Sequence, residues 1–266
     1  VGSEMCIRDR TEGACASGGL AFHQAVMSVK AGLYDTVLVG GVERMTHQTT
    51  PVVTKALASA MDIEREASTG LTFPGSFALI ANRYFYEYGN VLEEMAMVSV
   101  NSHRNALLNP HAQLQKQIDI DTVLNAPRIA DPLGLYDCSL ITDGAAFVVI
   151  SSRPTGADRK IMVSGIGHGG DALTLQGKSS ITEFAATKRA SARAYEQAGM
   201  SPQDIDLAEV HDCFSITQII NIEDLGFVEK GKGASAVRDG EIALEGRIPI
   251  NTSLSLIHIS EPTRRY

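Results

Sequence analysis

The thiol of Cys15 lies in a run of small residues, GACASGG at positions 13–19, directly ahead of a helical pattern. The reactive form of cysteine is the thiolate, which the unpaired N–H groups and positive dipole end of a following helix stabilise. The glycines in this run would let a substrate carbonyl approach backbone donors closely. These features would allow Cys15 to act as a nucleophile that attacks a carbonyl carbon. The alternative, which the local pattern alone favours, is a small buried apolar residue.

His211 is the second candidate functional residue. It follows the apolar run LAEV at positions 207–210, which predicts a short strand. Ligands of open α/β sheets bind outside the carboxyl ends of the strands, which is where His211 would lie. The alternative is a histidine satisfied by neighbouring backbone, with Asp212 as the cap of a helix predicted from FSITQII. We expect Cys213 to be a packing residue, and Cys138 has no predicted role.

Helices and strands alternate along the rest of the chain, as in α/β proteins. Apolar residues recur at helical spacing from Phe22 to Leu33, so a helix begins just after Cys15 and stops near Gly32. The run TVLVGG at 36–41 predicts a buried strand. Further elements are predicted as strands at 147–151 and from Ile161 onward, and as a helix at about 183–198 that ends at Gly199.

Residues 46–142 differ in character and predict a long insertion over one face of a core. Helical stretches are expected around 51–66, 75–88 and 91–107, separated by proline-marked loops. Asn90 and Glu93 have the spacing of a helix N-cap with a capping box.

Composition excludes several classes of function. The 266-residue chain carries a net charge of −8, which argues against a nucleic-acid partner. It contains no run of eighteen apolar residues, so no membrane span is expected. Setting Cys6 aside, the three remaining cysteines form no Cys-x-x-Cys pair. This predicts reduced thiols in a cytoplasmic protein, with neither a disulfide framework nor a metal site.

The two ends of the chain are related to each other through DNA. Codons can be chosen for residues 254–264 whose reverse complement, read in another frame, encodes residues 1–9. The ends of a natural protein have no reason to be reverse complements, and both strings resemble a translated sequencing adaptor. We therefore interpret 1–10 and 254–266 as non-native tails and exclude them from fold reasoning.

Two motifs carry a resemblance to a known family. EGACASGGLAFHQAVMSVKAGLYDTVLVGGVERMT, residues 12–46, resembles the nucleophile segment of thiolases, whose Cys-x-Ser motif maps onto Cys15 and Ser17. EVHDCFSI, residues 209–216, resembles the His-Asp-Cys-Phe motif of the sterol-carrier-type thiolases and their archaeal and bacterial relatives. The likeness extends through DPLGLYDCSLITDGAA and covers nearly all of residues 11–253.

The resemblance implies the thiolase fold, in which two related α/β halves are layered as α/β/α/β/α. We expect it to be incomplete at both ends, with one half formed by 11–45 and 143–152, an inserted loop domain at 46–142, and the other half at 153–253. Members of the family are usually dimers or tetramers, so the resemblance also implies a homo-oligomer.

The resemblance further implies acyl transfer between coenzyme A thioesters, as in acetyl-CoA acetyltransferases, with no permanently bound cofactor. Cys15 would take the acyl group from an acyl-CoA, and His211 would donate a hydrogen bond to the thioester oxygen. The family's Gly-His-Pro and Cys-x-Gly motifs are absent from this sequence. We therefore expect a native enzyme of this class but an inactive 266-residue chain. The alternatives are a β-ketoacyl synthase, against which the His-Asp-Cys-Phe motif argues, and a non-catalytic paralogue that binds acyl-CoA or scaffolds a partner.

Overall fold

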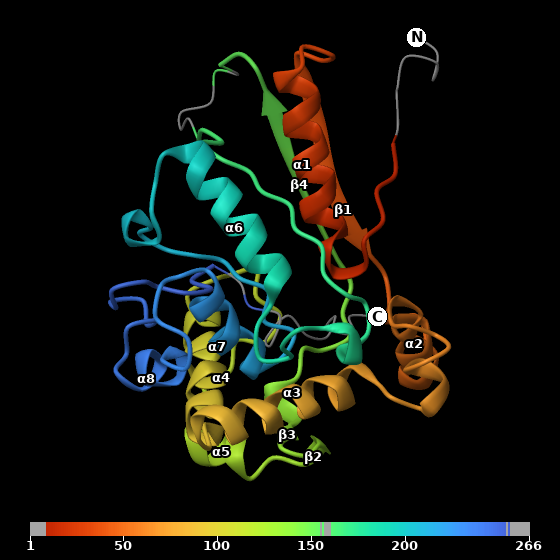
Figure 1. Ribbon diagram of the computed structural model, residues 1–266, viewed down its shortest axis with the longest axis vertical. Helices are drawn as coiled ribbons and strands as arrows, with labels where there is room; N and C mark the ends of the chain where they lie inside the picture. Colours follow the sequence, from red (N-terminus) through yellow and green to blue (C-terminus); the bar gives the residue numbers. More distant parts are fainter. Residues whose placement is uncertain (1–8, 155, 157–160, 254, 256–266) are drawn as a thin grey trace.

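The helix that follows the candidate nucleophile packs against a two-stranded antiparallel sheet (Figure 1). The computed structural model describes residues 9–154, 156, 161–253 and 255. Helix α1 (Ser17–Lys30) begins after the 3₁₀ turn η2 (Ala14–Ala16), and Gly32 follows it in the left-handed region at φ 73°. Both the start of this helix and its stop at Gly32 are confirmed.

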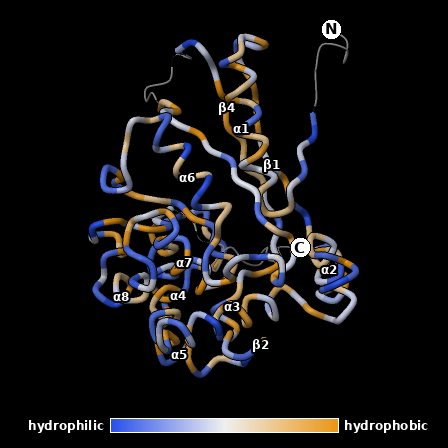
Figure 2. Tube along the Cα trace, in the orientation of Figure 1, coloured by the Kyte–Doolittle hydropathy of each residue, from blue (hydrophilic) through white to orange (hydrophobic). Residues whose placement is uncertain are grey.

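The sheet consists of β1 (Thr36–Glu43) and β4 (Gly144–Ser151), with Thr36 opposite Ser151 and Glu43 opposite Gly144. Both strands were predicted, but the expectation that the first is buried is wrong. The outer sheet face, formed by Leu38, Val42, Phe147 and Val149, is between 57% and 70% exposed. Helix α1 lies against the sheet, and no described element covers the outer face, although Figure 2 shows the hydrophobic character of both strands.

The segment that starts at Ile161 is extended but is not a strand, contrary to the prediction. It has no hydrogen-bonded partner strand among the described residues, which a β-strand requires. It lies instead along α6 (Ala185–Ala198), which ends at Gly199 as predicted. A Cβ on Gly165, Gly167 or Gly169 would meet a backbone carbonyl of this helix, belonging respectively to Ala194, Ala190 and Ala186. The alternating glycines therefore permit a close approach of backbone to helix.

The main hydrophobic core surrounds helix α7 (Ser215–Asp224), every residue of which is buried. Helices α3 (Phe73–Tyr88), α4 (Leu92–Ala106) and α8 (Gly233–Arg238) pack around it. The remaining short elements are α2 (Thr50–Leu57), α5 (Ile120–Leu124), β2 (Arg128–Ala130), β3 (Leu133–Gly134) and the 3₁₀ turns η3 (Ala58–Ala60), η4 (Ala67–Thr69), η5 (Leu135–Asp137), η6 (Leu175–Gly177) and η7 (Pro202–Asp204).

Two predicted details of residues 46–142 are wrong. The helix expected over 51–66 stops as α2 at Leu57 and continues only as a 3₁₀ turn to Ala60. The N-cap of α4 is Val91, not Asn90, and no capping box forms. The Asn90 side chain still accepts a hydrogen bond from the Leu92 N–H at 3.0 Å, so it supports the helix start from one residue further out.

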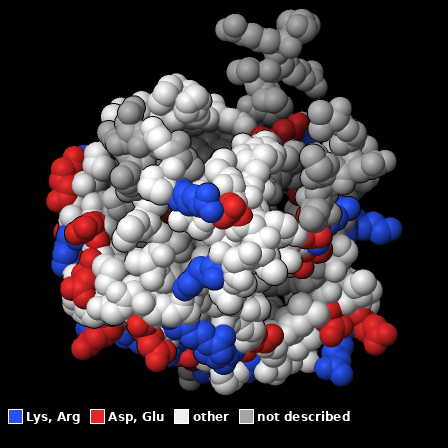
Figure 3. Space-filling view, turned by 90° about the horizontal axis from the view of Figure 1, so that it is seen from above, with Lys and Arg blue, Asp and Glu red and all other residues white. Residues whose placement is uncertain are grey.

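Charged residues of both signs are interspersed on the face seen in Figure 3, and neither sign forms a continuous patch there. Among the described helices, none combines the length and apolar character needed to cross a membrane. Most of the two predicted tails, 1–8, 254 and 256–266, lies outside the described residues.

Candidate active site

The loop that carries Cys15 is braced by Glu12. The Glu12 carboxylate accepts hydrogen bonds from the N–H of Gly13 at 3.1 Å, the N–H of Ala14 at 2.8 Å and the Ser17 hydroxyl at 3.0 Å. Ala14 is in the left-handed region at φ 51°, a conformation that is rare for a residue with a Cβ and needs support from its surroundings. These contacts, first among them the Ala14 N–H, lower the pKa of Glu12. Sequence reasoning missed Glu12, and only its position in the quoted segment could have drawn attention to it.

The structure corrects the expectation that the helix start favours a Cys15 thiolate. Cys15 is exposed, yet the surrounding protein desolvates its sulfur, and this burial raises the pKa of the thiol. A backbone hydrogen bond opposes the rise without cancelling it. No basic side chain in the described part of the chain contributes to the pKa of Cys15. A desolvated thiol without a cationic or basic partner keeps its proton at neutral pH.

His211 lies on an irregular segment. The strand predicted at 207–210 is reduced to a single parallel bridge between Ala208 and Ile250, because no longer strand pairs with it in the described residues. His211 is exposed as a residue, and desolvation by the protein around it lowers the pKa of its imidazole. A lowered pKa keeps the ring neutral at pH 7, in the form that carries one N–H donor.

The alternative in which Asp212 caps a helix is wrong. Helix α7 has Phe214 as its N-cap, with no side-chain cap. The Asp212 carboxylate instead accepts a hydrogen bond from the Ser255 hydroxyl. Among the described residues, no hydrogen bond to the His211 imidazole is seen, so the described backbone does not satisfy its ring.

A second loop supports the segment around His211. Cys138 forms an antiparallel bridge with Phe214, and the Ser139 N–H donates to the Cys213 carbonyl at 2.9 Å. The buried Asp137 accepts a hydrogen bond from the Ser215 hydroxyl at 2.6 Å. Burial raises the pKa of Cys138 to about 12 and that of Cys213 still further, so neither is a thiolate at neutral pH.

The Cys15 loop lies close enough to the segment that follows His211 for an electrostatic interaction between them. Cys15 adds to the rise in the pKa of Cys213, which places the first thiol within interaction range of the residue two positions after His211. The fold thus brings the start of α1 to the segment that leads into α7, although these are distant in sequence. Among the described residues, no group of three or more His, Cys, Asp or Glu side chains is arranged to hold a metal.

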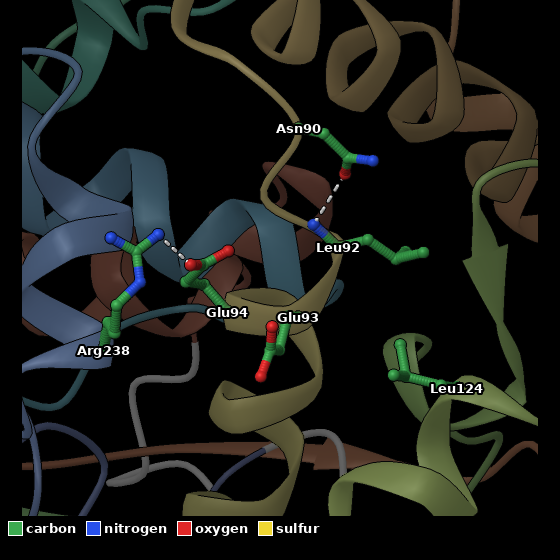
Figure 4. A pocket seen from close by; sticks show the side chains of 6 residues that line it. All are labelled: Asn90, Leu92, Glu93, Glu94, Leu124 and Arg238. Atoms are coloured by element: carbon green, nitrogen blue, oxygen red, sulfur yellow. Dashed lines mark hydrogen bonds and ion pairs between the residues drawn. The ribbon is translucent and has the colours of Figure 1, made fainter.

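A pocket of about 400 Å³ opens elsewhere, at the start of α4. Its lining consists of Asn90, Leu92, Glu93, Glu94, Leu124 and Arg238 and includes neither candidate residue. In Figure 4 the Glu94 carboxylate faces the Arg238 guanidinium, and the two form an ion pair. The buried Glu94 carboxylate therefore already has its partner.

Comparison with known proteins gives concordant matches. The family model "Thiolase, N-terminal domain" matches residues 3–154, and "Thiolase C-terminal domain-like" matches residues 167–263. An acetyl-CoA acetyltransferase of Methanothermobacter thermautotrophicus is 45% identical over 247 residues, and one of Methanocaldococcus jannaschii is 44% identical over 241. These alignments cover 92% and 89% of this chain, but only 64% and 61% of the relatives. The chain therefore spans less than two thirds of either relative.

A solved structure titled "Ltp2-ChsH2(DUF35) aldolase" is also similar. It superposes with a TM-score of 0.74 at 27% sequence identity, covering 90% of this chain and 63% of that one.

Proposed function

This chain belongs to the thiolase family and has its fold, and from this premise we propose that it is part of an acyl-CoA C-acyltransferase that uses Cys15 as its nucleophile. The reaction is acyl transfer between coenzyme A thioesters, with acetyl-CoA as one substrate and a β-ketoacyl-CoA as the condensation product. The observation that carries the proposal is the match of residues 3–154 and 167–263 to the two thiolase family models. Cys15 also lies within electrostatic range of Cys213, two residues after His211. The names of the acetyl-CoA acetyltransferase relatives support the same reaction.

The chemistry follows from the two side chains. The Cys15 sulfur attacks the thioester carbon, a new carbon–sulfur bond forms, and the bond to coenzyme A breaks, so that the acyl group rests on Cys15 and the proton ends on the released thiol. The neutral His211 imidazole donates its N–H to the carbonyl oxygen as negative charge grows there. Removal of one such donor typically slows the reaction by about a hundredfold or more.

Because the pKa of Cys15 is raised, we propose that a base from outside the described residues activates this thiol in the native enzyme. This agrees with the absence of the Gly-His-Pro and Cys-x-Gly motifs from the sequence, and we expect the 266-residue chain alone to be inactive. On the family pattern, 11–45 with 143–152 and 153–253 form the two related halves and 46–142 the inserted domain. We also propose a cytoplasmic homodimer or tetramer without a permanently bound cofactor.

The test compares the 266-residue chain with the full-length protein that carries the same segment. We expect thiolysis of acetoacetyl-CoA by the full-length protein, its loss by about a thousandfold or more in C15S, and no turnover by the short chain. Appreciable turnover by the short chain would overturn the assignment of the missing base, and full activity of C15S would overturn the proposed nucleophile.

The second candidate is a paralogue that binds acyl-CoA without turning it over, which the raised pKa of Cys15 favours. Iodoacetamide labelling of the full-length protein separates the two functions. Rapid alkylation of Cys15 that acetyl-CoA prevents supports catalysis, whereas a thiol that stays inert supports binding alone.

A further inference from the structure

Two buried asparagine side chains hold the main chain on either side of the His211 Cα. The Asn251 Oδ1 accepts a hydrogen bond from the Val210 N–H at 2.7 Å, and the Asn221 Nδ2 donates one to the His211 carbonyl at 2.8 Å. Asn221 is 7% exposed and Asn251 only 1%. A backbone N–H can only donate and a carbonyl can only accept, so these contacts also fix which end of each amide faces the segment.

Of the two polar atoms in the Asn251 side chain, only the oxygen has a described hydrogen-bond partner. Its φ of 52° lies in the left-handed region, which asparagine tolerates better than most other residues. Its N–H donates to the Ala208 carbonyl at 2.9 Å, and its carbonyl accepts from the Asn105 side chain at 3.1 Å. Its Nδ2 is buried and has no acceptor among the described residues.

Asn221 lies on a helix that is packed into the core, because α7 is buried along its whole length. The first residue of that helix, Ser215, is bonded to the buried Asp137 at 2.6 Å. The His211 imidazole, by contrast, has no hydrogen bond to a described residue. The described contacts that fix the direction of the ring therefore act through the main chain of residues 210–211.

We propose that Asn221 and Asn251 are positioning residues that aim His211 at the substrate's carbonyl oxygen. This rests on the proposed function, in which His211 stabilises the negative charge of the transition state. A catalytic group displaced by about 1 Å can lose on the order of a hundredfold in rate. The effect is expected in kcat more than in KM, because the donor is needed most as charge develops.

One substitution at both positions makes a matched test in the full-length protein. Asn→Asp at 221 removes the N–H that the His211 carbonyl needs, whereas Asn→Asp at 251 keeps the oxygen that the Val210 N–H needs. Both variants bury a carboxylate, so a general burial penalty is common to them. A third variant, N251G, removes the oxygen without straining the left-handed backbone. Thermal unfolding followed by circular dichroism checks that each variant folds.

We expect kcat for thiolysis to fall about ten- to a hundredfold in N221D and N251G, with KM changed less than about threefold, and N251D to stay within about threefold of wild type. Wild-type kcat in N221D and N251G, or an equal loss in all three variants, would overturn the positioning role. Hydrogen exchange at the Val210 N–H gives a readout that needs no activity: faster exchange in N251G but not in N251D supports the contact, and no change refutes it. If H211A keeps wild-type kcat, the proposed role of His211 fails, and the exchange data still decide whether Asn251 holds the segment.

Discussion

At the scale of single residues, the geometry of the Cys15 loop suits a nucleophile, whereas the protonation of its thiol does not. Glu12 and the left-handed Ala14 present the sulfur at the start of α1, as a nucleophile requires. Burial raises the pKa of that same sulfur, because no base accompanies it in the described part of the chain. The described residues therefore contain the loop that presents the thiol but not a base that would activate it.

The raised pKa of Cys15 predicts how alkylation of this thiol depends on pH in the 266-residue chain. Since the thiolate is the reacting form and its pKa is raised, the rate of reaction with iodoacetamide should rise with pH and still be rising above about 8.5, the ordinary thiol value. Peptide mapping by mass spectrometry after timed labelling measures the rate at this site. A rate that levels off below pH 8 would show a stabilised thiolate and contradict the raised pKa.

The two candidate residues could be proposed from sequence because each lies in a recognisable motif. Their supports could not, because they depend on contacts between distant positions. Asn251 meets Val210 only after the chain has folded, and nothing in the spacing of INTS and LAEV shows this. The pKa of Cys15 was mispredicted because helix N–H groups can be read from sequence, whereas desolvation by protein packed around the sulfur cannot.

At the scale of elements, glycines decide how closely an extended segment approaches α6. A Cβ at Gly167 would lie 1.8 Å from the Ala190 carbonyl oxygen. This is a steric clash with a main-chain atom, so the segment or the helix would have to shift to remove it. A Cβ at Gly170 would meet nothing within 4 Å. These two positions differ only in what surrounds them, so they make a direct comparison.

We predict that G167A lowers the free energy of unfolding by about 1–3 kcal/mol, as overpacking typically does. G170A should change it by less than about 1 kcal/mol, because the new methyl group points into open space. The urea midpoint and slope, followed by circular dichroism, measure both variants. Equal stability of G167A and wild type would mean that the segment does not lie against α6 as described.

Element type was predicted well wherever local pattern decides it. The helices at 17–30 and 185–198 end at glycines in the left-handed region, which the sequence marks directly. Strands need partners, and the runs at Ile161 and at 207–210 lack a long one among the described residues, so apolar pattern alone overpredicted them. Asn90 shows the same limit on a smaller scale, since its amide supports the start of α4 without being its cap.

At the scale of the whole molecule, the outer sheet face stands out because strands of this composition are usually covered. Leu38 is 66% and Phe147 57% exposed, on a chain that spans under two thirds of its relatives' length. Contiguous exposed apolar surface of this kind favours association with other apolar surfaces. We expect the outer sheet face to be covered in the full-length protein.

The 266-residue chain should accordingly bind the dye ANS and self-associate. L38K should reduce both effects in this chain, because it places a charge in the middle of the exposed face. The matched control is L79K, which changes an exposed leucine on α3 that lies outside this face. ANS fluorescence and light scattering give the readouts. Equal reductions in the two variants would show that the dye does not report on the outer sheet face.

The central claim is that Cys15 carries the acyl group during the reaction. Full-length protein is incubated with acetyl-CoA, quenched in acid, and analysed by intact-mass spectrometry and peptide mapping, with C15S as the control. The account predicts one acetyl group per chain, located on Cys15 and absent from C15S. An unmodified Cys15 in an enzyme that still turns over, or acetylation that persists at the same level in C15S, would contradict it.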